Sequence, residues 1–227
     1  MEKQFNELMT KTLFRSPEHS LTSEYLMQYE YPWQALGDLP AIIRAIGAQL
    51  PTDEYDRIGE SVWISKRATI APTAAIDGPC VIIGHGATVR HCALIRENVI
   101  LGEGVNVGHC TGVKNSILFD EVQVPHYNYV GDSILGYKAH MGAGAVTSNV
   151  KSDKSPVHVK GTDLDIDTGR KKVGAMIGDG VEIGCGAVLC PGTVIGKGST
   201  VYPLVRVRGV ITENHIVKST GFIVPRR

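Results

Sequence analysis

Residues 177–207 read IGDGVEIGCGAVLCPGTVIGKGSTVYPLVRV, and an aliphatic residue returns at every sixth position of this stretch. The same step runs through the first half of the chain, with one slip of a single residue and a break near Pro125. The stepped positions are Ile58, Ile64, Ile70, Ile76 and Ile82, then Ile83, Val89, Ile95, Leu101, Val107, Val113 and Phe119, then Leu135 and Met141, then Ile177, Ile183, Leu189, Ile195, Val201 and Val207.

A period of six matches neither the 3.6-residue period of an α-helix nor the two-residue period of a single strand. It fits a triangular coil in which each side is one short strand. One aliphatic side chain per side then points inward, and a small or turn-forming residue makes the corner. Three six-residue sides complete one coil, so the sequence predicts about five coils before residue 150 and about two after residue 173.

The composition excludes several classes of protein. With 23 basic and 23 acidic residues among 227, the chain lacks the basic face that nucleic-acid binding requires. It contains no apolar run long enough to span a membrane, and its first residues do not resemble a secretory signal. Five cysteines without a Cys-x-x-Cys pair favour free, buried thiols in a reducing cytoplasm over a disulfide framework.

Three segments lack the six-residue step. Residues 1–57 contain two predicted helices, Glu7 to Phe14 and a second one from Asp38 to Leu50, expected to cap the open end of the coil. Residues 58–212 form the coil itself, and residues 150–173 interrupt it with a polar loop. A loop of this length within a regular solenoid is usually functional. Residues 213–227 are expected to form a C-terminal tail.

The densest polar stretch follows the break in the repeat. It contains His126, Tyr129, Val130, Gly131 and Asp132, which match the His-x-x-Tyr-aliphatic-Gly-Asp motif of a family of acyltransferases. The chain resembles hexapeptide-repeat proteins, in particular the acetyltransferase domain of bifunctional glucosamine-1-phosphate acetyltransferase/N-acetylglucosamine-1-phosphate uridyltransferase and the β-helical tails of sugar-phosphate nucleotidyltransferases. The resemblance covers roughly residues 58–212 and implies an all-β solenoid, the left-handed parallel β-helix.

The resemblance also implies a reaction, the transfer of acetyl from acetyl-CoA to the amine of a hexosamine 1-phosphate, most simply glucosamine 1-phosphate. A histidine that titrates near neutrality can take the proton of the attacking amine, and His126 occupies the family position of this base. Ala143, between two glycines, occupies the position whose backbone N–H stabilises the oxyanion. No metal is required for this chemistry.

Further site residues follow from the same resemblance. Fixed cations would hold the substrate phosphate, and neutral groups would hold the sugar. The implied substrate-binding residues are Arg96, Lys114, Tyr129, His140, Asn149 and Lys172, and the implied cofactor-binding residues are Ala143, Cys185, Arg206 and Arg208. The sequence departs from the family at two of these positions, where His140 replaces an asparagine and Cys185 replaces a serine. Both departures bear on the identity of the acceptor more than on the reaction.

The family forms trimers with active sites between adjacent prisms, so the resemblance implies a homotrimer whose inserted loops reach toward a neighbour's cleft. No Gly-rich nucleotide loop occurs in residues 1–57. We therefore expect acetyl transfer without uridyl transfer, and a separate nucleotidyltransferase for the following step.

Two other functions remain open on the sequence. A γ-class carbonic anhydrase shares the fold and binds zinc through three histidines, and this chain has His85, His91, His109, His126 and His140, but it lacks the family's spaced histidine pair. A non-catalytic trimeric scaffold or sugar-nucleotide-binding module is the second. Within the acetyltransferase hypothesis, galactosamine 1-phosphate or a nucleotide-linked 4-amino sugar are alternative acceptors.

Overall fold

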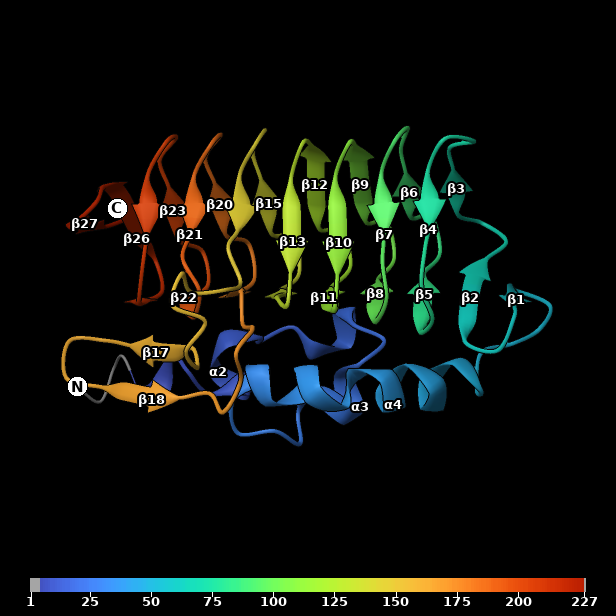
Figure 1. Cartoon of the computed structure of the whole chain (residues 1–227), viewed down its shortest axis with the longest axis horizontal. Helices are drawn as coiled ribbons and strands as arrows, with labels where there is room; N and C mark the ends of the chain where they lie inside the picture. The colour runs from blue at the N-terminus through green and yellow to red at the C-terminus, as the bar shows by residue number, and fades with distance from the viewer. Residues whose placement is uncertain (1–4, 227) are drawn as a thin grey trace.

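The computed structural model describes residues 5–226 and confirms the predicted triangular coil, whose three parallel sheets we call the first, second and third faces (Figure 1). The first face contains, in order, β1 (Tyr55–Ile58), β2 (Val62–Ser65), β5 (Val81–Ile83), β8 (Val99–Leu101), β11 (Ser116–Leu118), β14 (Ile134–Leu135), β19 (Ala175–Ile177), β22 (Thr193–Ile195) and β25 (Val210–Ile211). The second contains β4 (Ala75–Ile76), β7 (Leu94–Ile95), β10 (Gly112–Lys114), β13 (Tyr129–Gly131), β16 (Val146–Thr147), β21 (Val188–Leu189) and β24 (Arg206–Val207). The third contains β3 (Thr69–Ile70), β6 (Thr88–Val89), β9 (Asn106–His109), β12 (Gln123–His126), β15 (His140–Met141), β20 (Glu182–Ile183), β23 (Thr200–Val201), β26 (His215–Ser219) and β27 (Phe222–Pro225).

The coil is left-handed. In Figure 1 the second face lies in front with its strands pointing down, the third face lies behind with its strands pointing up, and the chain advances from right to left. Viewed along that direction of advance, the chain turns counterclockwise. Five coils precede the inserted loop, as predicted, and two complete coils and part of a third follow it.

The register departs from the predicted one at two places. Leu118, and not Phe119, pairs with Leu101 and Leu135, because one residue separates Val113 from the corner at Asn115, whereas two separate Ile95 from the equivalent corner at Asn98. Phe119 turns away from the interior column, and its ring lies 5.0 Å from that of Phe14. The expected break at Pro125 is absent, since Val124 pairs with Val107 and keeps the step.

The two ends of the coil also differ from expectation. Ile58 lies in β1, which runs antiparallel to β2, and its side chain is 56% exposed, so it is not a core position. At the other end, the expected tail over residues 213–227 is wrong for the part that the structure describes, up to residue 226, because β26 continues the third face and β27 pairs with it antiparallel. These antiparallel strands cover sheet edges that would otherwise present unpaired backbone groups.

The N-terminal helices lie along the first face and not over an open end, so the expected end cap is wrong (Figure 1). They are α2 (Thr10–Leu13), α3 (Ser23–Leu26) and α4 (Ala35–Gly47), with 3₁₀ turns at Pro17–His19 and Pro32–Gln34. The outward row of the first face is apolar throughout and buried, which explains the cover: Trp63, Ile82, Ile100, Ile117, Ile134, Met176, Val194 and Val210. Gly47 packs so closely on Trp63 that a Cβ there would lie 2.5 Å from the ring.

Both predicted helices begin at other residues than expected. The first is reduced to α2, which starts after Met9 without a side-chain cap. The second starts at Ala35, directly after the 3₁₀ turn, so Asp38 lies within its first turn and does not cap it. The Asp38 carboxylate instead accepts a hydrogen bond of 2.7 Å from the Tyr29 hydroxyl. None of the helices among residues 5–226 is long and apolar enough to cross a membrane.

All five cysteines are free thiols, but they are not uniformly buried as the sequence suggests. Cys80 is buried, whereas Cys92, Cys110 and Cys185 are exposed. Cys80, Cys92 and Cys110 have φ near +60° at corners of the coil. Their role is therefore to turn the chain, and at two of these corners the side chain faces solvent.

A buried carboxylate holds the N-terminal segment on the coil. Asp179 accepts backbone hydrogen bonds from Arg15 (2.9 Å), Ser16 (3.0 Å) and Tyr137 (3.0 Å), and its side chain is almost completely buried. Burial raises the pKa of the Asp179 carboxyl, and the three amides oppose that rise. A single side chain thus joins two segments far apart in the sequence.

Replacing this carboxylate should loosen the N-terminal cover. Asp179→Ala leaves three amide donors without their acceptor, so we expect the free energy of unfolding in urea to fall by about 2–3 kcal/mol. Asp163→Ala, in the exposed turn between β17 and β18, is the control and should leave the unfolding midpoint unchanged. Equal midpoints for the two variants would contradict this role of Asp179.

Candidate functional site

A column of histidines lies along the edge where the third face turns into the second. His126 pairs with His109 across β12 and β9, and the amide of Cys110 bonds to the carbonyl of His91 in the coil before. The His126 and His109 rings are 4.9 Å apart at their centroids, with their Nδ1 atoms 3.3 Å apart. One Nδ1 donates to the other, so the exposed Nε2 of His126 keeps a lone pair when its own Nδ1 is the donor.

Ala143 and Cys185 follow His126 along the same column. The Gly144 amide donates to the His126 carbonyl (2.9 Å), and the Gly186 amide donates to the Ala143 carbonyl (2.8 Å). Ala143 is exposed, and its amide donates no hydrogen bond within residues 5–226. The structure therefore brings together the predicted base, the predicted oxyanion donor and Cys185, in consecutive coils.

Asn128, which the sequence analysis did not single out, fixes the geometry of this column. Its side chain is almost completely buried, and its Oδ1 accepts from the His126 amide (3.0 Å). Its Nδ2 donates to the carbonyls of Gly142 (2.8 Å) and Ala145 (3.0 Å). One amide side chain thus ties the histidine to the Gly-Ala-Gly turn, and only the coil register reveals this.

The predicted phosphate ligands lie along the second face, toward its far edge. Lys114 ends β10, and Arg96 follows β7 in the coil before. Glu97 contacts both cations, with distances of 3.4 Å to Lys114 Nζ and 3.5 Å to Arg96 Nε. Burial would raise the pKa of Glu97, but its own amide and the two cations hold that pKa below its usual value. The pair is therefore held in place by a carboxylate with which an anionic ligand must compete.

A buried carboxylate, Asp132, holds Asn149 at the same edge, and Asn149 in turn contacts Tyr129. Asp132 accepts from Asn115 Nδ2 (2.8 Å) and from Asn149 Nδ2 (2.5 Å), and it is almost completely buried. Asn149 Nδ2 also lies 3.3 Å from the Tyr129 hydroxyl. A Cβ at Gly131 would lie 2.5 Å from that hydroxyl, so the glycine leaves room for the tyrosine ring. Asp132 thus orients Asn149 directly, and Tyr129 only through Asn149.

Lys172 joins Lys114 in a cavity of about 530 Å³, which we call the lysine pocket. Its other basic lining residues are Arg170 and Lys171, and α4 supplies the opposite wall through Leu36 and Gly37. Arg170 Nη2 donates to the Leu36 carbonyl at 3.4 Å. Neither Arg170 nor the second predicted helix was expected to take part in this site, because contact between residues so far apart depends on where α4 lies.

The remaining predicted residues lie elsewhere. His140 is on the third face, where its Nδ1 lies 2.7 Å from a Glu182 carboxylate oxygen. Arg206 and Arg208 lie at the end of the second face, in a separate cavity of about 400 Å³ beside the insert. A single chain thus carries the predicted set in four places: the His126 column, the edge with the lysine pocket, the third face at His140, and the cavity at Arg206 and Arg208. The His126 column and the lysine pocket lie at opposite edges of the second face.

The other histidines have partners within the coil. His85 Nδ1 lies 2.6 Å from the Ser65 hydroxyl and its Nε2 lies 2.9 Å from Glu54, while His91 Nδ1 lies 2.9 Å from the Thr73 hydroxyl. Nowhere in residues 5–226 do three His, Cys, Asp or Glu side chains gather so that they could hold a metal ion.

Two family descriptions match adjoining parts of the chain. The GMPPB C-terminal domain matches residues 77–169, and the bacterial transferase hexapeptide, a unit of six repeats, matches residues 174–209. The division between them falls at the end of the insert.

Relatives match the chain over part of their own length. A bifunctional sugar-1-phosphate nucleotidylyltransferase/acetyltransferase of Sulfurisphaera tokodaii is 36% identical over 91 residues, covering 40% of this chain and 23% of the relative. The bifunctional protein GlmU of Methanococcus aeolicus is 35% identical over 173 residues, covering 74% of this chain and 41% of the relative. The chain spans less than half the length of these curated relatives.

Solved structures are more distant. The acetyltransferase domain of PglB from Neisseria gonorrhoeae, in complex with acetyl coenzyme A, is 20% identical with a TM-score of 0.29, covering 72% of this chain and 57% of that one. A mutant of AntD, an N-acyltransferase from Bacillus cereus, in complex with dTDP and coenzyme A, is 18% identical with a TM-score of 0.29, covering 74% and 82%. At TM-scores this low, neither structure bears on the reaction of this chain.

The hydrogen bonds of Asn128 predict that the stability of the fold depends on this side chain. Asn128→Ala removes the acceptor of one amide and the donor of two carbonyls, so we expect the free energy of unfolding to fall by about 2–3 kcal/mol. Asn106→Ala, on the third face, is the control, because the buried Oδ1 of Asn106 accepts no hydrogen bond among the described residues. Chemical denaturation of both variants tests this prediction. A loss of unfolding free energy in Asn106→Ala alone would contradict the role given to the hydrogen bonds of Asn128.

Proposed function

We propose that this chain, a hexapeptide-repeat homologue of the C-terminal acetyltransferase domain of bifunctional GlmU proteins, is an N-acetyltransferase. It moves acetyl from acetyl-CoA to the amine of a hexosamine 1-phosphate, with glucosamine 1-phosphate as the first acceptor to test. The observation that carries the proposal is the His126 column, where an exposed imidazole lies one coil from the exposed amide of Ala143.

The chemistry follows from these two groups. His126 Nε2 accepts the proton of the sugar amine as its nitrogen attacks the thioester carbonyl, forming the new C–N bond. The carbonyl oxygen becomes an oxyanion, which the Ala143 N–H stabilises. Collapse of the tetrahedral intermediate breaks the C–S bond, and the departing CoA thiolate takes up the proton that His126 accepted. Asn128 acts as a positioning residue, since it joins both groups through their backbone.

The acceptor would lie along the second face. Its phosphate would meet Arg96, Lys114 and Lys172, which lie around or beside the lysine pocket. Tyr129 and Asn149, the latter held by Asp132, would bond to sugar hydroxyls. Arginine and lysine supply the charged hydrogen-bond donors that a phosphate dianion requires. The phosphate would compete with the Glu97 carboxylate for Arg96 and Lys114.

The donor would bind toward the C-terminal coils. Cys185 stands next to Ala143 in the His126 column, and Arg206 and Arg208 are available to CoA phosphates. His140, at the start of the strand that leads to Ala143, would contact the acceptor. The product would be an N-acetylhexosamine 1-phosphate, which a separate nucleotidyltransferase would consume.

A homotrimer would bring these separate places together. The first face is covered by the chain's own N-terminal helices, so packing between prisms must use the second and third faces, which meet at the His126 column. Light scattering should give a mass three times that of the 24.5 kDa chain. A monomer at assay concentration would remove the intersubunit cleft on which this arrangement depends.

The decisive assay follows thiol release from acetyl-CoA with glucosamine 1-phosphate as acceptor. His126→Ala should lower kcat by on the order of a hundredfold, because the amine loses its base. His91→Ala is the matched control, since it belongs to the same column but lies two coils away and bonds to Thr73. No release in the wild type, in protein that binds CoA, would redirect the search to other amines. A trimer that neither binds CoA nor releases thiol would be a scaffold.

A further inference from the structure

The insert carries a β-hairpin that seats directly on the last coils of its own chain. The hairpin consists of β17 (His158–Lys160) and β18 (Asp165–Asp167), and an antiparallel bridge between Val150 and Lys172 closes its base. The loop is expected from the sequence to reach toward a neighbour. Instead β17 packs against β22 of the first face, and Val157 and Val159 are completely buried.

Two glycines make this seat possible. A Cβ at Gly192 (φ 77°) would lie 2.7 Å from the His158 carbonyl oxygen, and a Cβ at Gly209 (φ 88°) would lie 2.6 Å from the Lys160 carbonyl oxygen. Each position therefore requires glycine both for its backbone conformation and for the close approach of the hairpin. The hairpin is a fixed wall and not a freely moving loop.

The seat decides where the polar side chains of the hairpin point. Successive residues of a strand face opposite sides, so burial of Val159 turns His158 and Lys160 outward. Both line the 400 Å³ cavity against the end of the second face, which we call the insert pocket. Lys151, from the start of the insert, lines it as well, and the coil contributes Arg206 and Arg208.

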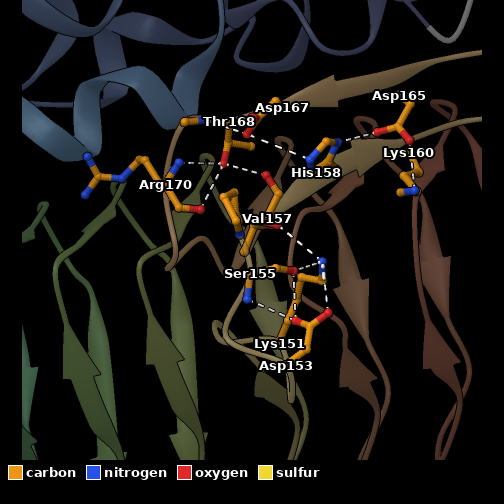
Figure 2. A network of polar contacts seen from close by, with 12 residues as sticks. Lys151, Asp153, Ser155, Val157, His158, Lys160, Asp165, Asp167, Thr168 and Arg170 are labelled. Atoms are coloured by element: carbon orange, nitrogen blue, oxygen red, sulfur yellow. Dashed lines mark hydrogen bonds and ion pairs between the residues drawn. The ribbon is translucent and has the colours of Figure 1, made fainter.

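The charges of the insert pocket are unequally compensated. Lys160 Nζ lies 2.8 Å from Asp165, and His158 Nδ1 lies 2.6 Å from the same carboxylate (Figure 2). Lys151 bonds to the Ser155 hydroxyl and lies 3.8 Å from Asp153, which also lines the pocket. Within the part of the chain that the structure describes, neither Arg206 nor Arg208 pairs with a carboxylate. The two guanidinium groups, which have no carboxylate partner among the described residues, thus line the pocket together with the basic side chains of the insert.

We propose that the hairpin completes an anion-binding site with Arg206 and Arg208 that holds the phosphates of a nucleotide. Four permanent cations against two carboxylates, Asp153 and Asp165, leave an excess of two positive charges, which suits a diphosphate or several phosphate groups. Two ligands offer that chemistry, CoA and a sugar nucleotide. Assignment to CoA rests on the proposed acetyl transfer, whereas the anion site itself does not.

The test measures dissociation constants by isothermal titration calorimetry with CoA and, separately, with UDP-N-acetylglucosamine. Lys160→Ala should weaken binding of the cognate nucleotide about tenfold, the effect of losing one charge-assisted hydrogen bond. Lys66→Ala is the matched control, because Lys66 is similarly exposed (44% against 49%) and also faces an aspartate. Its dissociation constants should equal those of the wild type.

A second pair of variants tests the seat without removing a charge. Gly209→Ala should unseat the hairpin and weaken nucleotide binding, whereas Gly180→Ala has a comparable φ of 62° and nothing within 4 Å of its added Cβ. Weakening of CoA alone by Lys160→Ala and Gly209→Ala supports the donor as occupant, and weakening of UDP-N-acetylglucosamine alone supports the sugar nucleotide. Unchanged constants for both ligands in both variants would overturn the inference, even if the wild type transfers acetyl. Conversely, CoA binding that both variants weaken, in a protein that transfers acetyl to none of the amines tested, would refute the proposed function and leave the anion site supported.

Discussion

Each coil of this molecule can bury its inward aliphatic side chains only by stacking on the next coil. The interior column of the first face, Ile83, Leu101, Leu118, Leu135, Ile177 and Ile195, is continuous across the insert, because Leu135 pairs directly with Ile177. Because each coil stacks on the one before it, residues that are one full coil apart in the sequence become neighbours in space. The His126 column exists for this reason, since His126, Ala143 and Cys185 belong to three coils and no local segment could bring them together.

The same constraint leaves three flat faces, and the chain uses them differently. The first face is apolar outward as well as inward, and the N-terminal segment covers it along its length. Asp179 and the contact of Gly47 with Trp63 fix that cover. The second and third faces carry the polar candidates, and α4 reaches one edge of the second face to form a wall of the lysine pocket. The N-terminal segment therefore contributes to the shape of a candidate site as well as to stability.

The sequence predicted the coil well, because a hydrophobic period is a property of neighbouring positions. It failed where a corner changed the length of a side, as at Asn115, since a left-handed corner can form at many residue types. The outward apolar row of the first face was present in runs such as Val81–Ile83, yet a period of six assigns only one position per side to the core. Resemblance supplied His126 and Lys172, but Asn128, Asp132 and Arg170 act through contacts between coils or with α4, which require the register and the path of the chain.

The bridge between Val150 and Lys172 closes the insert at its neck, and the coils above and below it pair as if the segment were not there. The solenoid therefore forms a continuous scaffold, and the insert is a separate module attached to it. Because the strands pair directly across the insertion point, an insert of different length or charge can stand there without changing the register of the coil. The insert meets the rest of the chain closely at Gly192 and Gly209, which leave room for the hairpin backbone, and at Gly37 of α4, which leaves room for Arg170. Ligand preference in such an architecture can change by exchange of one module while the folding unit stays constant.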